Sequence, residues 1–575
     1  MKFRLFLLCA LCVPVLNALA LDREAFTFTN YDLTVRIEPE QQRLGVRGKI
    51  ALRNDSSTPQ KIGVLQISSS LGWRSIKAAG KQLQFVSQTY TSDIDHTGSL
   101  SEAIVTLPEA IPPKGSVELE IAYEGVIVID ATRLTRIGAP EAEAKTSDWD
   151  QISAKFTAVR GAGNVAWYPI ATEDASLSEG ASLSEILGRW KAREAGSTMR
   201  LQMSVLSGEG DAPELLVNAT TCPTSQQGEH EFVADCSYRS MASIVPTFVI
   251  ASYETVEHPS VSVHFLQGRA SSAANYADAA DKALPLIAEW FGNPKNKAQT
   301  ADLPDANSSP FESGSLLLMP LTSIDPKLAG LMAAHQLTHS AFYSARLWIN
   351  EGLAHFAQAL QVEHQSGRKA ALDYMRSHQS KAVTAATDDA DPKELHHTPN
   401  ETSQSLINTY DEQLYRGKAM SVWWMLRDMV GDAALKKAIA DYRPEQDKEP
   451  SYMQRLIQAH TERDLEWFFD DWIYRDRGLP DFKVASAFTR KTLPEGYMLT
   501  ITVGNSGTAG AEVPVTVKFE GGEVTQRLLV RSKSNTVIRV PVPKQPEEIV
   551  VNDGSVPESK TSNNTFKIEA TDTAK

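Results

Sequence analysis

Hydrophobic and polar residues alternate along much of the first half of the chain. Two clear runs have their apolar residues at Leu33, Val35 and Ile37, and at Val46, Ile50 and Leu52. A period of two is typical of a strand with one buried face and one exposed face. Polar clusters such as residues 54–57 separate these runs and indicate turns. We therefore predict that residues 26–255 are rich in strands, with an insertion or helical excursion near 171–195.

The hydrophobic period changes at about residue 270. Residues 273–291 have helical spacing and end at Gly292-Asn293-Pro294, which is typical of a helix stop. A second helix is predicted to begin with Asp325 as its cap and Pro326 in its first turn. One face of that helix carries Leu328, Met332, His335, His339 and Phe342. We expect this face, and both histidines with it, to turn toward the interior.

Alternation returns after Pro480, with apolar positions at every second residue of 497–503, 513–519 and 538–542. These runs predict a C-terminal β-sandwich of immunoglobulin-like type over 481–555. Residues 556–575 are rich in polar residues and are predicted to be a disordered tail. The fold class is therefore multidomain α+β, with a β-rich domain at 21–258, a mainly helical domain at 259–480 and the sandwich.

The N-terminus has the composition of a secretory signal peptide. Lys2 and Arg4 precede an apolar stretch, and Ala18-Leu19-Ala20 supplies a small-x-small cleavage site. We predict that residues 1–20 are removed and that the protein is secreted or periplasmic. No later run approaches the roughly 18 apolar residues of a membrane span. A net charge of −14, without a basic run, argues against nucleic acid or an anionic membrane as partner.

Two cysteines follow the predicted signal peptide. Cys222 and Cys236 are predicted to form a disulfide in an oxidising compartment, and the alternative is a pair of free thiols. Their spacing fits no common cysteine zinc pattern, so we do not assign them to a metal.

The candidate chemistry lies in residues 335–351. His335 and His339 are four residues apart, so on a helix they project from one face. Glu351 follows in Trp-Ile-Asn-Glu-Gly and can supply a third ligand to Zn²⁺, which accepts imidazole nitrogen and carboxylate oxygen. The histidine pair alone is weak evidence, because the same spacing occurs by chance in core and surface helices.

The order of motifs along the chain resembles the M1 family of zinc aminopeptidases. The resemblance is carried by Tyr31-Asp32-Leu33, Trp167-Tyr168-Pro169, Pro246-Thr247-Phe248, Trp348-Ile349-Asn350-Glu351-Gly352, Tyr415-Arg416-Gly417-Lys418 and the segment 469–484. It implies a thermolysin-like fold for the helical domain, and peptides or protein N-termini as partners. It also implies zinc ligands at His335, His339 and Glu351.

The resemblance implies two further site residues. Tyr415 would donate a hydrogen bond to the oxyanion, and otherwise is an ordinary core or surface aromatic. Glu312 would bind the α-amino group of the substrate, and otherwise is a solvated loop carboxylate.

Two positions depart from the family pattern. Gln336 occupies the place of the general base and cannot accept a proton, although its amide can hold a water molecule. Only eleven residues separate His339 from Glu351, which is shorter than the usual run in the family. Three hypotheses remain: a metallopeptidase weakened at Gln336, an inactive pseudopeptidase that serves as a peptide-binding or scaffolding protein, and an exported structural protein. The sequence does not specify an oligomeric state.

Overall fold

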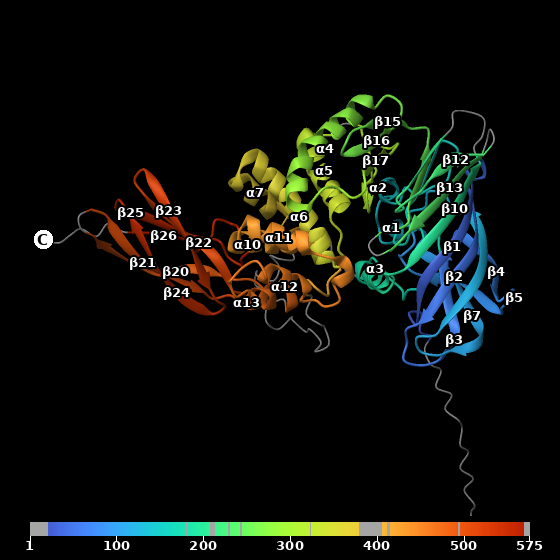
Figure 1. The fold of residues 1–575 in the computed structure, drawn as a ribbon, viewed down its shortest axis with the longest axis horizontal. Coiled ribbons are helices and arrows are strands. Elements are labelled where there is room, and N and C mark those ends of the chain that lie inside the picture. Colours follow the sequence, from blue (N-terminus) through green and yellow to red (C-terminus); the bar gives the residue numbers. More distant parts are fainter. Residues whose placement is uncertain are drawn as a thin grey trace, which may run out of the picture.

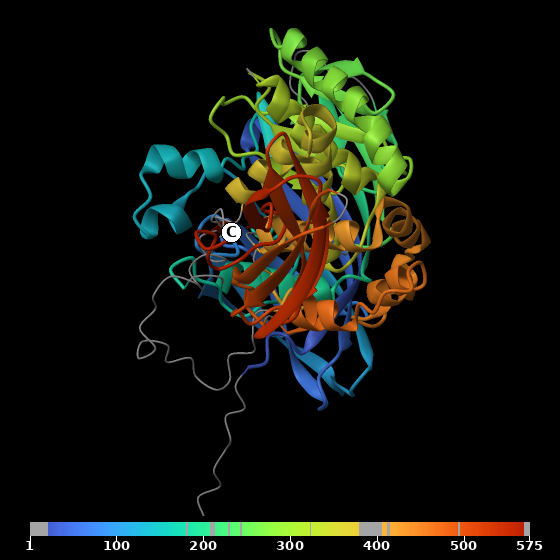
Figure 2. The same ribbon diagram turned by 90° about the vertical axis from the view of Figure 1, so that its left-hand side faces the viewer.

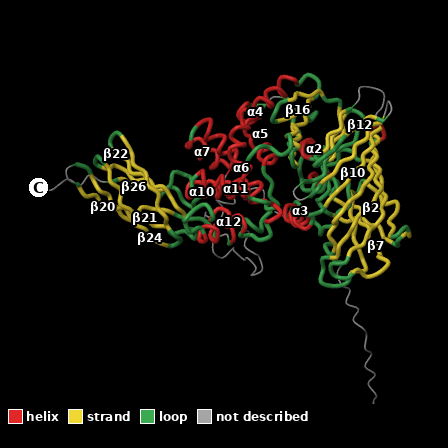
Figure 3. The backbone as a smooth tube through the Cα atoms, in the orientation of Figure 1, coloured by secondary structure: helices red, strands yellow, loops and turns green. Residues whose placement is uncertain are grey.

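The computed structural model describes residues 21–179, 182–206, 213–227, 231–241, 244–322, 324–378, 405–410, 414–475, 477–492 and 495–568. The predicted signal peptide, residues 1–20, lies outside the described residues. The molecule is elongated, with sheets at both ends and helices between them (Figures 1 and 3). Among the described residues, each helix is too short or too polar to span a bilayer.

The N-terminal region is built from three sheets. The largest contains β1 (Phe26–Glu38), β2 (Arg43–Asn54), β4 (Leu71–Ala78), β5 (Lys81–Gln82), β8 (Ser116–Val126), β10 (Thr198–Leu206), β12 (Thr224–Gln226) and β13 (Glu231–Tyr238). Its strand order is β12-β13-β10-β1-β2-β8-β4-β5, and only the β1–β10 pair is parallel. The alternation predicted this sheet correctly, because Leu33, Val35 and Ile37 of β1 are fully buried.

Two smaller sheets and three helices complete this region. One sheet contains β3 (Gln60–Ser68), β6 (Phe85–Thr91) and β7 (Ser99–Ile111), and the other β9 (Phe156–Val159), β11 (Glu214–Val217) and β14 (Phe248–Ala251). The helices are α1 (Thr132–Arg136), α2 (Glu141–Ser147) and α3 (Ser182–Arg193). The last of these is the helical excursion expected near 171–195. Cys222 and Cys236 are joined by a disulfide, and Cys236 lies on β13.

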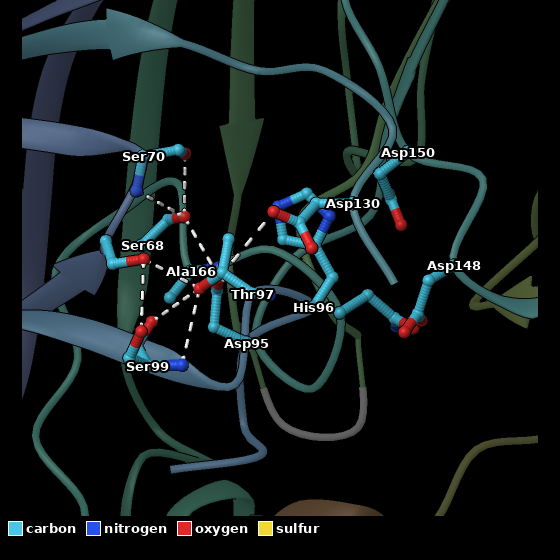
Figure 4. Close-up of polar contacts among 12 residues, drawn as sticks. Ser68, Ser70, Asp95, His96, Thr97, Ser99, Asp130, Asp148, Asp150 and Ala166 are labelled. Carbon is cyan, nitrogen blue, oxygen red and sulfur yellow. Dashed lines mark hydrogen bonds and ion pairs between the residues drawn. The ribbon is translucent and has the colours of Figure 1, made fainter. Parts of the chain in front are cut away.

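A buried polar network fixes the loop that follows β6 (Figure 4). Asp95 accepts hydrogen bonds from Ser68 Oγ at 3.1 Å, Thr97 Oγ1 at 2.8 Å and Ala166 N at 2.9 Å. His96 Nε2 lies 3.9 Å from Asp95, and neither ring nitrogen of His96 has a hydrogen-bond partner. The Ser68 hydroxyl is hydrogen-bonded to Asp95 and not to His96. These three residues therefore lack the serine–histidine hydrogen bond of a catalytic triad. The carboxylate connects the end of β3 to two loops.

The middle region combines helices with a five-stranded sheet. The strands are β15 (Glu254–Glu257), β16 (Val261–Phe265), β17 (Ala298–Asp302), β18 (Phe311–Ser313) and β19 (Leu316–Met319), in the order β15-β16-β17-β19-β18. The helices are α4 (Ala270–Phe291), α5 (Pro326–Ala341), α6 (Leu347–Ser366), α7 (Arg368–His378), α10 (Met420–Val430), α11 (Asp432–Asp441), α12 (Tyr452–Gln458) and α13 (Glu466–Phe469). Because β15 pairs with β16, this domain begins before the predicted boundary at residue 259.

The C-terminal region is a two-sheet sandwich. One sheet contains β20 (Phe482–Lys491), β21 (Tyr497–Asn505) and β24 (Ser534–Val542), and the other β22 (Ala511–Phe519), β23 (Gly522–Val530), β25 (Pro546–Val551) and β26 (Thr565–Lys567). Figure 2 looks onto this sandwich from its free end. The prediction of a disordered tail from residue 556 is wrong up to residue 568, because β26 pairs with β25 and Val556 is buried. Residues 569–575 lie outside the described part of the chain.

The hydrophobic core is divided between the two ends of the molecule. One cluster of buried residues runs from Ala25 to Ile250, within the N-terminal sheets. A second runs from Val261 to Val556 and includes both the helices and the sandwich. A small third cluster, with Trp149, Leu216 and Leu318, joins the N-terminal region to the middle sheet. The helical domain therefore shares a core with the sandwich and has only a narrow apolar junction with the N-terminal region.

Candidate metal centre

Helix α5 presents the two histidines. Asp325 caps it as predicted, since Oδ1 accepts hydrogen bonds from Lys327 N at 2.9 Å and Leu328 N at 3.2 Å. His335 and His339 are 14% and 10% exposed at their side chains, so their placement toward the interior is confirmed. Leu328 was expected on the same buried face but is 51% exposed, because it lies in the first turn of α5, where residues 326–328 are all exposed.

A short, hydrogen-bonded connection brings Glu351 to the histidines. Residues 342–346 join α5 to α6, and Ser344 N donates to Asn350 Oδ1 at 3.1 Å. Arg346 Nε donates to both carboxylate oxygens of Asp447, at 2.8 and 2.9 Å. These contacts fix the start of α6, one turn before Glu351. The shortened run between His339 and Glu351 is therefore compatible with convergence of the three side chains.

Helix α6 is held in place by close packing against α10. The Trp348 ring stacks on Trp423, with ring centroids 5.2 Å apart, and Trp423 Nε1 donates to the carbonyl of Trp348 at 3.2 Å. A Cβ on Gly352 would lie 2.9 Å from Trp423 Nε1 and 3.0 Å from Ala419 Cβ. Glycine after Glu351 thus allows the close approach that fixes this carboxylate.

The three side chains form a triangle of metal-ligand dimensions. His335 Nε2 and His339 Nε2 are 3.1 Å apart, and Glu351 Oε2 lies 3.7 and 3.5 Å from them. A tetrahedral zinc ion about 2.0–2.2 Å from its ligands places neighbouring ligand atoms about 3.3–3.6 Å apart. The three measured distances, 3.1, 3.5 and 3.7 Å, lie inside this range or within 0.2 Å of it, so these residues fit a zinc ion.

Burial and mutual charge set the protonation of this cluster. Burial lowers the pKa of His335 well below its ordinary value, and the neighbouring His339 lowers it further. Burial alone would lower the pKa of His339. The charge and hydrogen bond of the Glu351 carboxylate more than offset this effect and raise the pKa to about 9. In turn, burial would raise the pKa of Glu351, yet His339 lowers it below its usual range. Without metal, the pair is an imidazolium and a carboxylate, and a metal ion would replace that proton.

Glu312 is the fourth polar group of the cluster. It lies on β18, and its Oε2 is 3.6 Å from His335 Nε2. Ligand atoms of Glu312, His335 and His339 all lie within 4.8 Å of one another. Burial raises the pKa of Glu312 to about 7; the charge of His339 opposes this shift and that of Glu351 adds to it. Glu312 Oε1 is buried and has no hydrogen-bond partner. The alternative of a solvated loop carboxylate is wrong, since Glu312 is on a strand and its side chain is 21% exposed.

A cavity of about 270 Å³ adjoins the cluster and is lined by Glu312, His335, His339 and Glu351. Lys191 and Asn218 from the N-terminal region also line it, as does Lys295 from the connection after α4. The site thus lies where the N-terminal region meets the helical domain. Lysine and glutamate side chains share this lining with apolar residues such as Ile244, Phe342 and Leu347.

Gln336 points away from this cavity. Its Oε1 accepts hydrogen bonds from Tyr276 OH at 2.8 Å and Thr300 Oγ1 at 3.1 Å. Its Nε2 donates to the carbonyls of Gln299 at 2.8 Å and Ser315 at 3.2 Å. An amide has two donors and two acceptor sites, so the fully buried side chain has none left. The expectation that Gln336 can hold a water molecule is therefore wrong.

Tyr415 and His355, which the sequence also singled out, do not line this cavity. Tyr415 starts a one-turn π-helix (Tyr415–Ala419), is 3% exposed and donates its hydroxyl to the carbonyl of Thr409. The oxyanion role predicted for Tyr415 requires that bond to break. His355 packs on the His335 ring, with centroids 4.8 Å apart, and its Nδ1 lies 2.9 Å from Gln358 Oε1. Burial lowers the pKa of His355 to about 4, and the charge of Arg416, which was not predicted as a site residue, further lowers the pKa of both His355 and His335.

Comparison with known proteins agrees with part of this description. Residues 340–472 match the Peptidase family M1 domain. The match contains Glu351 and Tyr415 but begins directly after His339, and it covers a minority of the chain. The chain resembles M1 peptidases over this segment. No curated protein sequence matches it significantly.

Two similar solved structures are both of a mutant M1 zinc metallopeptidase from Deinococcus radiodurans. One has 15% identity and a TM-score of 0.46, and the match covers 78% of this chain and 94% of that one. The other, bound to a Tyr-Ser-Ala substrate, has 15% identity and a TM-score of 0.48, over 80% and 96% of the two chains.

Proposed function

We propose that this protein is an exported, M1-peptidase-like zinc protein that acts on or binds peptides, with hydrolysis weakened at Gln336. The observation that carries the proposal is the triangle of His335, His339 and Glu351, with sides of 3.1–3.7 Å, at the wall of a cavity. The match of residues 340–472 to the M1 domain supports the same class. Export rests on the signal-like residues 1–20.

His335, His339 and Glu351 would hold the zinc ion in this proposal. Zinc bound there supplies a Lewis acid that polarises a peptide carbonyl. The lysines and carboxylates of the cavity wall would orient the charged groups of the peptide. Gln336 accepts no proton, and loss of a general base costs about 10²–10⁴-fold in rate.

An inactive pseudopeptidase is the second candidate, and one observation favours it. The four hydrogen bonds of Gln336 occupy its amide completely, so the side chain contributes nothing to a water molecule at the metal. The protein would then keep the zinc and the cavity for binding alone.

The test is to measure bound zinc, peptide binding and hydrolysis of aminoacyl and peptide substrates by the mature chain and by His339→Gln. We expect zinc in the wild type and its loss in the variant, peptide binding, and hydrolysis that is slow and zinc-dependent. A wild-type kcat in the usual enzymatic range of roughly 1–10³ s⁻¹ would overturn weakened catalysis. A wild type without zinc would overturn the metal centre. Zinc and peptide binding without hydrolysis would select the pseudopeptidase.

A further inference from the structure

The proposed zinc triangle leaves one question, which is what occupies the fourth coordination position. Structural zinc sites are closed by a fourth protein ligand, whereas catalytic sites keep that position for water or substrate. We propose that Glu312 is the fourth protein ligand, so that His335, His339, Glu351 and Glu312 form a closed centre. The inference rests on the proposed zinc site and replaces the role of Glu312 as a binder of the peptide amino group.

The first support is distance. Glu312 Oε2 lies 3.6 Å from His335 Nε2, which is within the range of about 3.3–3.6 Å expected between ligands of one tetrahedral zinc ion. The corresponding distance for Glu351, which is already assigned as a ligand, is 3.7 Å. Glu312 therefore approaches His335 as closely as Glu351 does, and its ligand atom lies within 4.8 Å of that of His339.

The second support is the unsatisfied carboxylate. Glu312 Oε1 is buried and has no hydrogen-bond partner, although a buried carboxylate oxygen normally has one. The other carboxylate oxygen, Oε2, lies 3.6 Å from His335 Nε2, which is too long for a hydrogen bond. A cation between Glu312 and His335 would neutralise the carboxylate, and bidentate binding would also give Oε1 a partner.

The third support is the rigidity of the element that carries Glu312. Strands β18 and β19 form a hairpin in which Ser313 pairs with Leu316, and Gly314 has a φ of +64°, which favours glycine in such a tight turn. Ser313 Oγ accepts a hydrogen bond from Val245 N at 2.8 Å. The carboxylate is thus held in place by the sheet before any ligand binds, as a metal site requires.

A closed centre changes what the metal does. It connects the β18–β19 hairpin to α5 and α6, and a peptide carbonyl can reach the ion only by displacing Glu312. The completely hydrogen-bonded Gln336 is consistent with this, because a closed centre has no water molecule for a base to activate. The metal then mainly stabilises the cavity wall, and hydrolysis is slow because it requires the displacement of Glu312.

The first experiment is a zinc titration of the full mature chain in competition with a chromophoric chelator. Glu312→Gln keeps the size of the side chain and removes its charge, and Glu254→Gln, on an exposed position of β15, is the matched control. We expect at least about tenfold weaker zinc binding in Glu312→Gln, since loss of an outer partner alone can cost that much, and no change in the control. Equal affinity in all three proteins would overturn the fourth ligand.

The second experiment reads the open position directly. Azide is added to the Co²⁺-loaded proteins while the visible absorption of the metal is recorded. We expect no spectral change in the wild type and a change in Glu312→Gln, where the position is freed. A wild-type spectrum that responds to azide would overturn the closed centre, even if the variant fails to fold. A wild-type protein that binds neither zinc nor Co²⁺ would overturn the proposed zinc site itself. That outcome is distinct from an azide response, which overturns only the closed centre.

Discussion

At the scale of single residues, Gln336 has a structural role in place of the catalytic one that its position suggests. Its amide connects α5 to α4 through Tyr276 and to β17 through Thr300 and the carbonyl of Gln299. The fourth bond, to the carbonyl of Ser315, reaches the turn of the β18–β19 hairpin, next to the strand that carries Glu312. Gln336 therefore positions the elements of the metal centre without facing the metal.

Gln336→Glu is expected to destabilise the protein without restoring hydrolysis. The introduced carboxylate loses both donated hydrogen bonds and faces the carbonyls of Gln299 and Ser315, which costs about 2–4 kcal/mol of unfolding free energy. Its folded pKa is raised above the unfolded value of about 4.3, so the loss is small below that pH and grows as pH rises. Urea unfolding at pH 5 and pH 8 measures both effects.

The control is Gln365→Glu, which makes the same change at an exposed position of α6 and is expected to be nearly neutral. Unchanged stability of Gln336→Glu together with rapid peptide hydrolysis would show that this side chain turns to the metal after all.

At the scale of elements, the placement of α5 depends on its cap. Asp325→Ala removes the acceptor for two backbone N–H groups and is expected to lower the free energy of unfolding by about 1 kcal/mol. Asp325→Asn keeps a capping oxygen of the same reach and is expected to lose only a few tenths of that amount. Equilibrium urea unfolding of both variants checks the order. Equal losses in the two variants would mean that the cap contributes nothing beyond charge.

The sequence predicts local features well and long-range orientation poorly. Periodicity predicts β1, α4 and the sandwich strands, and the Asp-Pro pair predicts the start of α5, because each is decided by neighbouring residues. The sequence could not show how Glu351 reaches the histidines over so short a connection. The hydrogen bonds that shape this connection, from Ser344 to Asn350 and from Arg346 to Asp447, depend on the folded structure. The direction of Gln336 depends on Tyr276 and Thr300, which are distant in sequence.

At the scale of the whole molecule, the division of the core predicts two unfolding units. The N-terminal sheets have their own cluster of buried residues, whereas the helical domain and the sandwich share one. Contacts such as the bond from Trp472 Nε1 to the carbonyl of Gly510, at 2.8 Å, continue that shared core across the boundary near residue 480. The small third cluster is the apolar junction between the units, and we expect it to be too small to make them unfold together.

Scanning calorimetry of residues 21–575 is therefore expected to show two transitions, each of which responds to a different treatment. Reduction of the Cys222–Cys236 disulfide should lower only the transition of the N-terminal unit, because both cysteines pack with its core, and a disulfide typically contributes about 2–4 kcal/mol. Zinc should stabilise only the unit formed by the helical domain and the sandwich, because its proposed ligands lie in the middle domain. At a free zinc concentration 100 times the Kd, the unfolding free energy of that unit should rise by about 2.7 kcal/mol. The disulfide is reduced with a phosphine in one experiment, and zinc is removed with a chelator in another. A single transition that responds to both would show that the junction of Trp149, Leu216 and Leu318 couples the two units into one.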